Sequence, residues 1–256
     1  METLNVETNG PVARVTLNRP EVKNAFNEVV IRELSETFAS LPESVRVVVL
    51  TGGGDVFCAG ADVNWMKKSK TYTEEQNRAD AAAMSAMFRA IDECPKAVIG
   101  RINGVALGGG TGLTAVCDMA VAVETAQFGF TEVRLGIVPA VISAYVLPKI
   151  GEATARRYFL TGERFSAFDA VAMGLVHEVA KAETLDAKVD ELVKAVLACG
   201  PNAVAIAKKL IHDERRMTRD EAVAYTAATI ARVRVTPEAQ EGLGAFLEKR
   251  KPSWMA

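Results

Sequence analysis

Hydrophobic positions in the first half of the chain repeatedly follow the pattern of β-strands. Residues 12–17 (VARVTL) alternate apolar and polar side chains, which predicts a strand with one buried face. Residues 47–50 (VVVL) and 97–99 (AVI) are short continuous apolar runs, and 119–123 (MAVAV) is a further strand candidate. Continuous apolar runs of this length are typical of strands covered on both faces, as in a parallel sheet.

Helical periodicity occurs between these strands. Apolar side chains from Val30 to Phe38 recur at helical spacing, with Asn27 placed as an N-cap. Residues 74–92 carry an i, i+3, i+4, i+7 repeat that starts at Met84, which predicts a long helix. The alternation of strand and helix predicts an α/β fold.

The second half of the chain has a different character, because it is helical from about residue 140 onward. The predicted helices are 140–149, 152–160, 167–173, 184–198, 202–214, 219–232 and 237–249. We therefore expect an α/β catalytic core over residues 1–195 and a helical region over residues 196–256.

Composition narrows the class of protein. The 256 residues are 49% apolar and 24% charged, with a formal net charge of −2, so the chain can bury a sizeable core. This balance argues against a disordered chain and gives no general attraction to nucleic acid or an anionic membrane. Residues 1–5 lack the features of a signal peptide, and no long apolar run occurs, so we expect a cytoplasmic protein.

The four cysteines, Cys58, Cys94, Cys117 and Cys199, form no CxxC pair and have no histidine near them in sequence. This spacing argues against a zinc site or a disulfide framework. Cys58 and Cys117 are expected to be small buried apolar side chains rather than nucleophiles.

Common catalytic motifs are missing from the sequence. There is no HExxH, no GxSxG and no P-loop lysine. His177 follows an apolar run and is expected at a strand end, and His212 beside Asp213 is expected on a solvated helix surface.

Residues 110–115 (GTGLTA) match the dinucleotide pattern GxGxxA, with Glu124 after the next strand. The segment before Asp118 allows a helix of only about two turns. A dinucleotide-binding unit needs a longer crossover helix, so a nicotinamide oxidoreductase is a disfavoured alternative.

Two glycine-containing loops, residues 57–62 (FCAGAD) and 103–110 (NGVALGGG), each follow a predicted buried strand. Small residues let a ligand approach the main chain and leave N–H groups free to donate. Two such groups aimed at one carbonyl oxygen would form an oxyanion hole. Spacing alone equally allows the simpler interpretation that both loops are tight turns.

These motifs resemble those of the enoyl-CoA hydratase/isomerase (crotonase) family, and the similarity extends along nearly the whole chain. Besides the two loops, the similarity rests on CD at 117–118, AQFG at 126–129, LGIVP at 135–139 and LTG at 160–162. The resemblance is closest to bacterial 3-methylglutaconyl-CoA hydratase-like members. It implies a spiral of ββα units, a C-terminal helical region that builds a homotrimer or hexamer, and an acyl-CoA substrate without metal or other cofactor.

The resemblance also implies roles for individual residues. The backbone N–H groups of Ala61 and Gly109 would form the oxyanion hole that stabilises a thioester enolate. The implied substrate-binding positions are Ala59, Asp62, Val63, Asn64 and Gly112. Lys249 and Lys251 would reach CoA phosphates of a neighbouring subunit, with a solvated basic tail as the simpler interpretation.

Hydratases of this family carry two catalytic glutamates, and this chain keeps one. Glu132 matches the second, whereas the first falls at Gly112. Two carboxylates can hold a water and deliver it across C2=C3, while Glu132 alone suits double-bond isomerisation. We expect a 2-enoyl-CoA hydratase, branched substrates included, with a Δ3,Δ2-enoyl-CoA isomerase and a non-catalytic CoA-binding protein as alternatives. For Glu132, a helix-start carboxylate that neutralises a helix dipole or pairs with Arg134 is the structural alternative.

Overall fold

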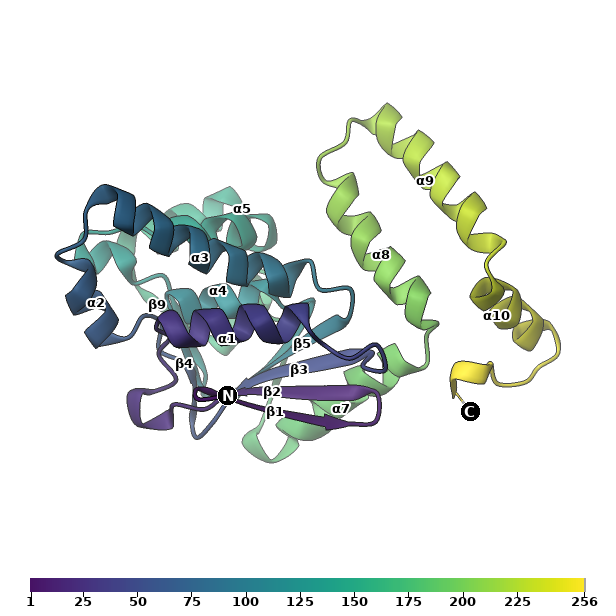
Figure 1. Cartoon of the computed structure of the whole chain (residues 1–256), viewed down its shortest axis with the longest axis horizontal. Helices are drawn as coiled ribbons and strands as arrows, with labels where there is room; N and C mark the ends of the chain where they lie inside the picture. The colour runs from purple at the N-terminus through teal and green to yellow at the C-terminus, as the bar shows by residue number, and fades with distance from the viewer. Residues whose placement is uncertain (256) are drawn as a thin grey trace.

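Two β-sheets lie at the centre of the molecule in the computed structural model, which describes residues 1–255 (Figure 1). The larger sheet has the order β1-β2-β3-β5-β7-β10, and all of its neighbouring strands run parallel except β1 and β2. Its strands are β1 (Leu4–Asn9), β2 (Val12–Leu17), β3 (Val47–Gly52), β5 (Ala97–Ile102), β7 (Met119–Val123) and β10 (Glu178–Ala180). β3 is buried along its whole length, as its continuous apolar run predicts.

The smaller sheet has the order β4-β6-β8-β9, with only the β8–β9 pair antiparallel. Its strands are β4 (Val56–Cys58), β6 (Val105–Leu107), β8 (Gln127–Gly129) and β9 (Arg164–Ser166). Three of these short strands follow directly after a long strand: β4 after β3, β6 after β5 and β8 after β7. One pass of the chain therefore contributes a strand to each sheet before it enters a helix.

The repeat of two strands and a helix confirms the expected spiral of ββα units. α2 (Val63–Ser69) and α3 (Glu74–Asp92) follow β4, α4 (Gly109–Val116) follows β6, and α5 (Ala140–Thr161) follows β8 after a short 3₁₀ turn, η2 (Glu132–Leu135). The three turns of the spiral consequently bring the segments after β4, β6 and β8 to one region, because these strands are neighbours in the smaller sheet.

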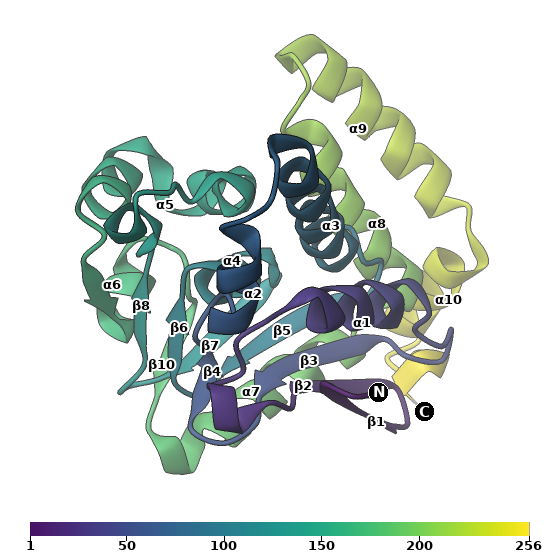
Figure 2. The ribbon, with the colours of Figure 1, turned by 60° about the vertical axis from the view of Figure 1, so that its left-hand side comes forward.

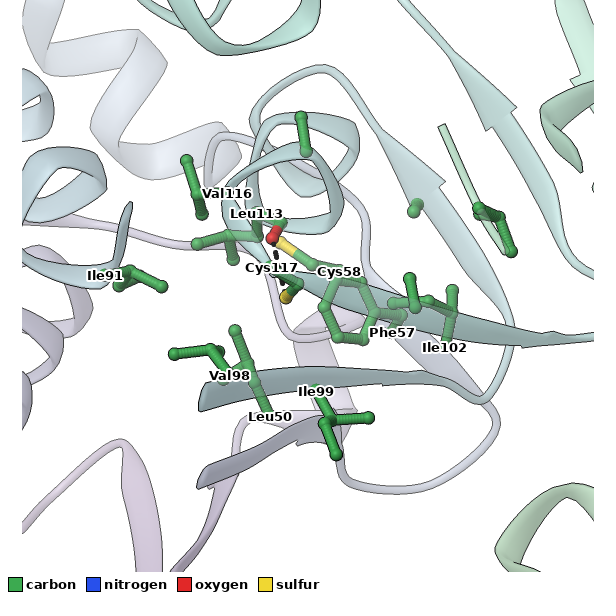
Figure 3. Close-up of a cluster of buried hydrophobic side chains, with 14 of the residues drawn as sticks. Leu50, Phe57, Cys58, Ile91, Val98, Ile99, Ile102, Leu113, Val116 and Cys117 are labelled. Carbon is green, nitrogen blue, oxygen red and sulfur yellow. Dashed lines mark hydrogen bonds between the residues drawn. The ribbon is translucent and has the colours of Figure 1, made fainter. Parts of the chain in front are cut away.

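The larger sheet is covered by helices on both faces. α1 (Glu28–Ala39) and α3 lie side by side over one face, and α7 (Leu185–Leu197) packs against β5 and β7 (Figure 2). A cluster of buried side chains joins the two sheets to α4; Figure 3 draws Phe57 and Cys58 from β4 and Leu113 and Val116 from α4 as parts of this cluster. α4 is thus held on a packed apolar base.

The helix predictions agree well with the structure. Residues 74–92 form α3, and Asn27 caps α1 by accepting from the backbone N–H groups of Val29 and Val30. The two helices expected at 140–149 and 152–160 are one segment with non-helical backbone at Gly151. α6 (Ala167–Ala172) and α7 lie within a residue of expectation.

The sequence patterns missed several short elements. These are β1, the four strands of the smaller sheet, β10, α2, and the 3₁₀ turns η1 (Pro20–Val22), η3 (Ala182–Thr184) and η4 (Ser253–Met255). Three-residue strands are too short to show a period of two, so no pattern of hydrophobicity predicts them.

The last three helices extend away from the sheets (Figures 1 and 2). They are α8 (Pro201–Glu214), α9 (Arg219–Arg234) and α10 (Pro237–Leu247). The boundary predicted at residue 195 falls in the last turn of α7, and the chain enters α8 only after Gly200. Large apolar side chains are exposed on this region, among them Val223, Phe246 and Leu247. No helix in residues 1–255 has the length and apolar character that crossing a membrane requires.

Candidate active site

The loops after β4 and β6 meet at two glycines. Gly60 has a φ of +91°, and a Cβ built on it would lie 2.8 Å from the Leu107 oxygen and 3.8 Å from the Gly109 nitrogen. Only a residue without a side chain allows both the left-handed backbone and this close approach. The structure therefore brings together the two glycine-containing loops that the sequence singled out.

The amide of Ala61 is left free by the way its loop pairs with Phe26. Phe26 donates its N–H to the Gly60 oxygen at 2.8 Å, and Asp62 donates its N–H to the Phe26 oxygen at 3.0 Å. In such a parallel pairing the residue between the two bonds directs its own N–H to the opposite side. Within residues 1–255 the Ala61 N–H has no hydrogen-bond acceptor.

Gly109 is the first residue of α4, where a backbone N–H has no partner inside the helix. Gly108 precedes it with a φ of +52°. A Cβ on Gly109 would overlap the ring of Phe26, so this position requires glycine for steric reasons. Phe26 therefore pairs with the first loop through its backbone and packs against the second through its ring.

Glu132 opens the η2 turn that follows β8, and its carboxyl group reaches the second loop. A Cβ on Gly108 would lie 3.2 Å from Oε1 of Glu132, one residue before the Gly109 amide. The Oε2 atom of Glu132 is buried and has no hydrogen-bond partner in the described chain. Burial raises the pKa of Glu132 above its ordinary value.

One structural alternative for Glu132, an ion pair with Arg134, is not what the structure shows. Across residues 1–255 no cationic side chain lies within 4.0 Å of this carboxyl group. Arg134 instead packs beside Gly162. A buried, unpaired carboxylate is costly to desolvate, and such groups are candidates for a functional role.

These groups line one pocket of about 420 Å³. One wall is formed by the loop residues Ala59, Gly60, Ala61, Gly108 and Gly109 together with Glu132. A second wall is formed by Trp65, Met66, Asp80, Ala81 and Met84 from α2 and α3. The start of α5 closes the pocket with apolar side chains, among them Val141 and Ile142. A mostly apolar pocket with few polar groups is the usual form of a small-molecule site.

Asp62, Val63 and Asn64 lie outside the lining of this pocket, so their expected contact with the substrate stays a prediction. Asp62 is buried, pairs with Arg19 at 2.9 Å and caps α2 by accepting from the Asn64 N–H at 2.7 Å. Burial alone would raise the pKa of Asp62, but the bonds from Asn64 and Arg19 lower it overall. The next two residues turn into α2 instead of continuing the loop, and Val63 is exposed.

Gly112 is likewise outside the lining. It is buried in α4, and a Cβ built on it would overlap a methyl group of Ile142 and lie 3.1 Å from the ring of Phe88. The space beside position 112 is therefore filled by apolar groups. A carboxylate in place of Gly112 would require Ile142 to move.

Sequence reasoning missed the wall that α2 and α3 contribute. The stripe of Met84, Met87, Phe88 and Ile91 predicts the buried face of α3 correctly, but it does not include the part of α3 before Met84. One helical period earlier, the same face carries Asp80 and Ala81. A polar residue on a core-facing stripe is a signal that the sequence did contain.

The remaining chemical candidates lie elsewhere. Nδ1 of His177 accepts from the Ala120 N–H at 3.1 Å, and burial lowers the pKa of His177. Burial raises the pKa of both Cys58 and Cys117 to about 12, so both are inert apolar side chains as expected. In residues 1–255, no three His, Cys, Asp or Glu side chains gather as a metal ion would need.

His212 differs from its expected position. Its Nε2 lies 3.8 Å from a carboxylate oxygen of Asp92 and 3.9 Å from one of Glu93, at the end of α3. The side chain is thus partly enclosed between α3 and α8, rather than solvated on a free surface.

The first glycine of the dinucleotide-like pattern is required by helix packing. α4 covers only eight residues, and a Cβ on Gly110 would overlap the backbone oxygen of Cys58. The first glycine of GxGxxA therefore packs α4 against β4.

Comparison with known proteins decides the family. Residues 7–256 match the family described as enoyl-CoA hydratase/isomerase. The chain belongs to this family. Among its relatives, it is 31% identical to crotonyl-CoA hydratase of Syntrophomonas wolfei over 259 residues, which covers 100% of this chain and 98% of the relative. It is 32% identical to short-chain-enoyl-CoA hydratase of Clostridium acetobutylicum, covering 98% and 97% of the two chains.

Solved structures give the same family. The crystal structure of an enoyl-CoA hydratase from Shewanella pealeana superposes with a TM-score of 0.94 at 40% identity, over 98% of this chain and 96% of that one. The crotonase fold expected from the sequence is therefore confirmed along nearly its whole length. Members of the enoyl-CoA hydratase/isomerase family act on acyl-CoA thioesters.

Proposed function

We propose that this member of the family is an enoyl-CoA hydratase that adds water across the C2=C3 bond of a 2-enoyl-CoA, branched acyl chains included. The observation that supports this most directly is the unpaired carboxyl group of Glu132, which contacts Gly108 next to the free amide of Gly109. A proton-transfer group and a donor for a carbonyl oxygen thus occur in one pocket. The names of the two curated relatives agree with this reaction.

The reaction follows from where charge develops. When hydroxide adds to C3 of the conjugated thioester, negative charge moves to the thioester oxygen and an enolate forms. The N–H groups of Ala61 and Gly109 would donate to that oxygen, and one such donor is worth roughly 3–4 kcal/mol of barrier in other enzymes. Glu132 would take the proton from the attacking water. The overall addition of water moves no electrons to an acceptor, so the proposed reaction needs no redox cofactor.

A double-bond isomerase is the second candidate, and the packing at Gly112 favours it. A hydratase of this family carries a second carboxylate at that position, whereas Ile142 and Phe88 fill the space here. With Glu132 alone, the simplest chemistry removes a proton from C2 of a 3-enoyl-CoA and returns it to C4. The product is the conjugated 2-enoyl-CoA.

Ultraviolet absorbance of the purified chain with a panel of 2-enoyl- and 3-enoyl-CoA substrates tests both candidates. A hydratase bleaches the conjugated enoyl-thioester absorbance, whereas an isomerase generates it from the 3-enoyl substrate. Loss of absorbance with straight or branched 2-enoyl-CoA supports the proposal. Binding of acyl-CoA without turnover of any substrate would show a non-catalytic CoA-binding protein and overturn both.

We further propose that α8, α9 and α10 assemble the chain into a trimer or a hexamer. Exposed Val223, Phe246 and Leu247 on these helices give the apolar surface that such an interface needs. Light scattering coupled to size exclusion measures the assembly. A monomer at micromolar concentration would contradict this proposal, and Lys249 and Lys251 would then have no neighbouring CoA to reach.

A further inference from the structure

A second carboxyl group lines the pocket, and it comes from α3 rather than from the glycine-containing loops or η2. Asp80 lies in the middle of α3 and lines the same pocket as Glu132, Ala61 and Gly109. Met84, four residues after Asp80 and therefore on the same helix face, lines the pocket as well, and so does Ala81. Asp80 therefore lies on the face of α3 whose other residues are directed toward the pocket or the core.

The surroundings of Asp80 distinguish it from an ordinary surface acid. Its side chain is partly buried, and within residues 1–255 no Lys, Arg or His nitrogen comes within 4.0 Å of its carboxyl group. The indole of buried Trp65 is its hydrogen-bonding neighbour. An acid without a cation at this depth keeps hydrogen-bonding capacity for a ligand beyond the bond from Trp65.

A short series of contacts connects Asp80 to the proposed oxyanion site. Trp65 packs against Phe26 with ring centroids 6.2 Å apart. The ring of Phe26 in turn occupies the space that a side chain on Gly109 would need. Asp80 thus shares the pocket with Glu132 and belongs to the part of its lining that α2 and α3 supply.

We propose that Asp80 is the second proton-carrying residue of this enzyme and performs, from α3, the role that Gly112 leaves unfilled on α4. This inference rests on the proposed hydration of a 2-enoyl-CoA. It deepens that proposal because it names the partner that Glu132 needs for hydration. The packing of Ile142 and Phe88 around Gly112 explains why the second acid has to come from another helix.

The proton transfers balance as follows. Glu132 as a carboxylate takes one proton from water, and the hydroxyl oxygen bonds to C3 while the C2=C3 electron pair moves to form the enolate. Asp80 as a carboxylic acid gives its proton to C2 as the enolate collapses to the thioester. The product gains one hydroxyl and one hydrogen. Exchange with solvent then returns the proton from Glu132 and restores one to Asp80.

The pKa of Asp80 is consistent with the donor role. Burial raises it, the hydrogen bond from Trp65 lowers it in part, and the negative charge of Glu28 adds to the rise. The acid form of Asp80 therefore persists to a higher pH than that of an exposed aspartate.

Comparison of hydration with isomerisation in two variants tests this role. Asp80→Asn removes the transferable proton but keeps the shape and polarity of the side chain. We expect the ratio of 2-enoyl-CoA hydration to 3-enoyl-CoA isomerisation to fall by about 10² in Asp80→Asn, because Glu132 alone can still shuttle a proton between carbons. Asp80→Glu should restore part of the hydration. Glu75→Gln removes an exposed acid from the same helix and should leave both rates unchanged.

Several measurements separate a proton-transfer role from a structural one. Loss of Asp80 should remove the alkaline limb of the pH profile for hydration, whereas a packing residue would leave the shape of that profile intact. Equal losses of hydration and isomerisation, or a rise in KM with kcat unchanged, would overturn the role of Asp80 even if the wild-type chain is a hydratase. A wild-type chain that turns over neither substrate would instead overturn the proposed function itself.

Discussion

The two walls of the pocket are built in opposite ways. The wall of the β4 and β6 loops presents main-chain groups, and its glycines are fixed because Gly109 abuts Phe26 and Gly108 abuts Glu132. The wall of α2 and α3 presents side chains such as Trp65 and Asp80. Few substitutions are possible in the backbone wall without a change in the position of its N–H groups. On the helical wall, by contrast, one side chain can be replaced without moving the others. The first wall therefore suits the shared step, enolate stabilisation, and the second suits the choice of reaction.

Glu132→Gln should give the largest loss of activity, because it acts on the backbone wall, where both candidate reactions need the carboxylate. We expect both hydration and isomerisation to fall by about 10²–10⁴, the usual contribution of a positioned general acid or base. Affinity for acyl-CoA, measured by calorimetry, should stay largely unchanged because the amide is close in size and shape. Retention of either activity in Glu132→Gln would show that the carboxylate of Glu132 is not the acid or base of that reaction.

Gly109→Ala should give the next largest effect. A Cβ at this position overlaps the ring of Phe26, so either the ring or the amide must move. Displacement of one oxyanion donor costs about 10²–10³ in kcat in other enzymes. Steady-state rates with a 2-enoyl-CoA measure the loss. Phe26→Leu provides the matched test, because Gly109→Ala should lower kcat less in a chain that lacks the Phe26 ring. An equal loss of kcat in both backgrounds would mean that the clash between the new Cβ and this ring is not the cause.

The difference between the walls also explains what could be predicted from sequence. The Gly-rich loops and Glu132 are recognisable because their chemistry depends on particular residues at fixed positions in a motif. Met66 and Met84 contribute only apolar surface to the pocket, which many side chains supply equally well, so no catalytic motif marks them. Asp62 illustrates the reverse case: it lies inside the motif, yet its carboxylate stabilises the loop through Arg19 and does not face the pocket.

The fold shows the same division. Long elements such as α3 and β3 carry enough residues for a period to emerge, and their bounds follow from sequence. The smaller sheet consists of three-residue strands, and its order depends on tertiary pairing that no local pattern encodes. This sheet nevertheless brings the two loops and η2 together, so the feature that assembles the site is the one that sequence reasoning could not predict.

The pH dependence of activity should report the burial of Glu132. Burial raises its pKa, so its carboxylate form is lost at a higher pH than in an exposed glutamate. We expect kcat/KM to fall as the pH drops through this raised pKa and to fall tenfold for each further pH unit. Profiles of kcat/KM for hydration and for isomerisation should share this acid limb. A limb at the ordinary pKa of glutamate would mean that Glu132 is solvated in the working enzyme.

Arg19→Ala should have the smallest effect on activity, because Arg19 supports the backbone wall without lining the pocket. Arg19 donates to Asp62 at 2.9 Å and to the Ala25 oxygen at 2.6 Å, and its side chain is only 18% exposed. We expect the free energy of unfolding to fall by about 1–3 kcal/mol at neutral pH, as for hydrogen bonds to a charged group. The pKa of Asp62 is lowered in the folded chain, so its contribution is present above the unfolded pKa and is lost as the pH falls through the folded one.

Urea unfolding at neutral and at acidic pH measures this penalty, and an exposed ion pair gives the matched control. Lys68 pairs with Glu28 at 2.6 Å with both side chains about half exposed, so Lys68→Ala should cost much less. Enoyl-CoA turnover should fall modestly in Arg19→Ala, because the Ala61 amide depends on the loop that Asp62 anchors. If Arg19→Ala cost no more than Lys68→Ala, the ion pair would not support the loop, and pairing with Phe26 alone would hold the backbone wall in place.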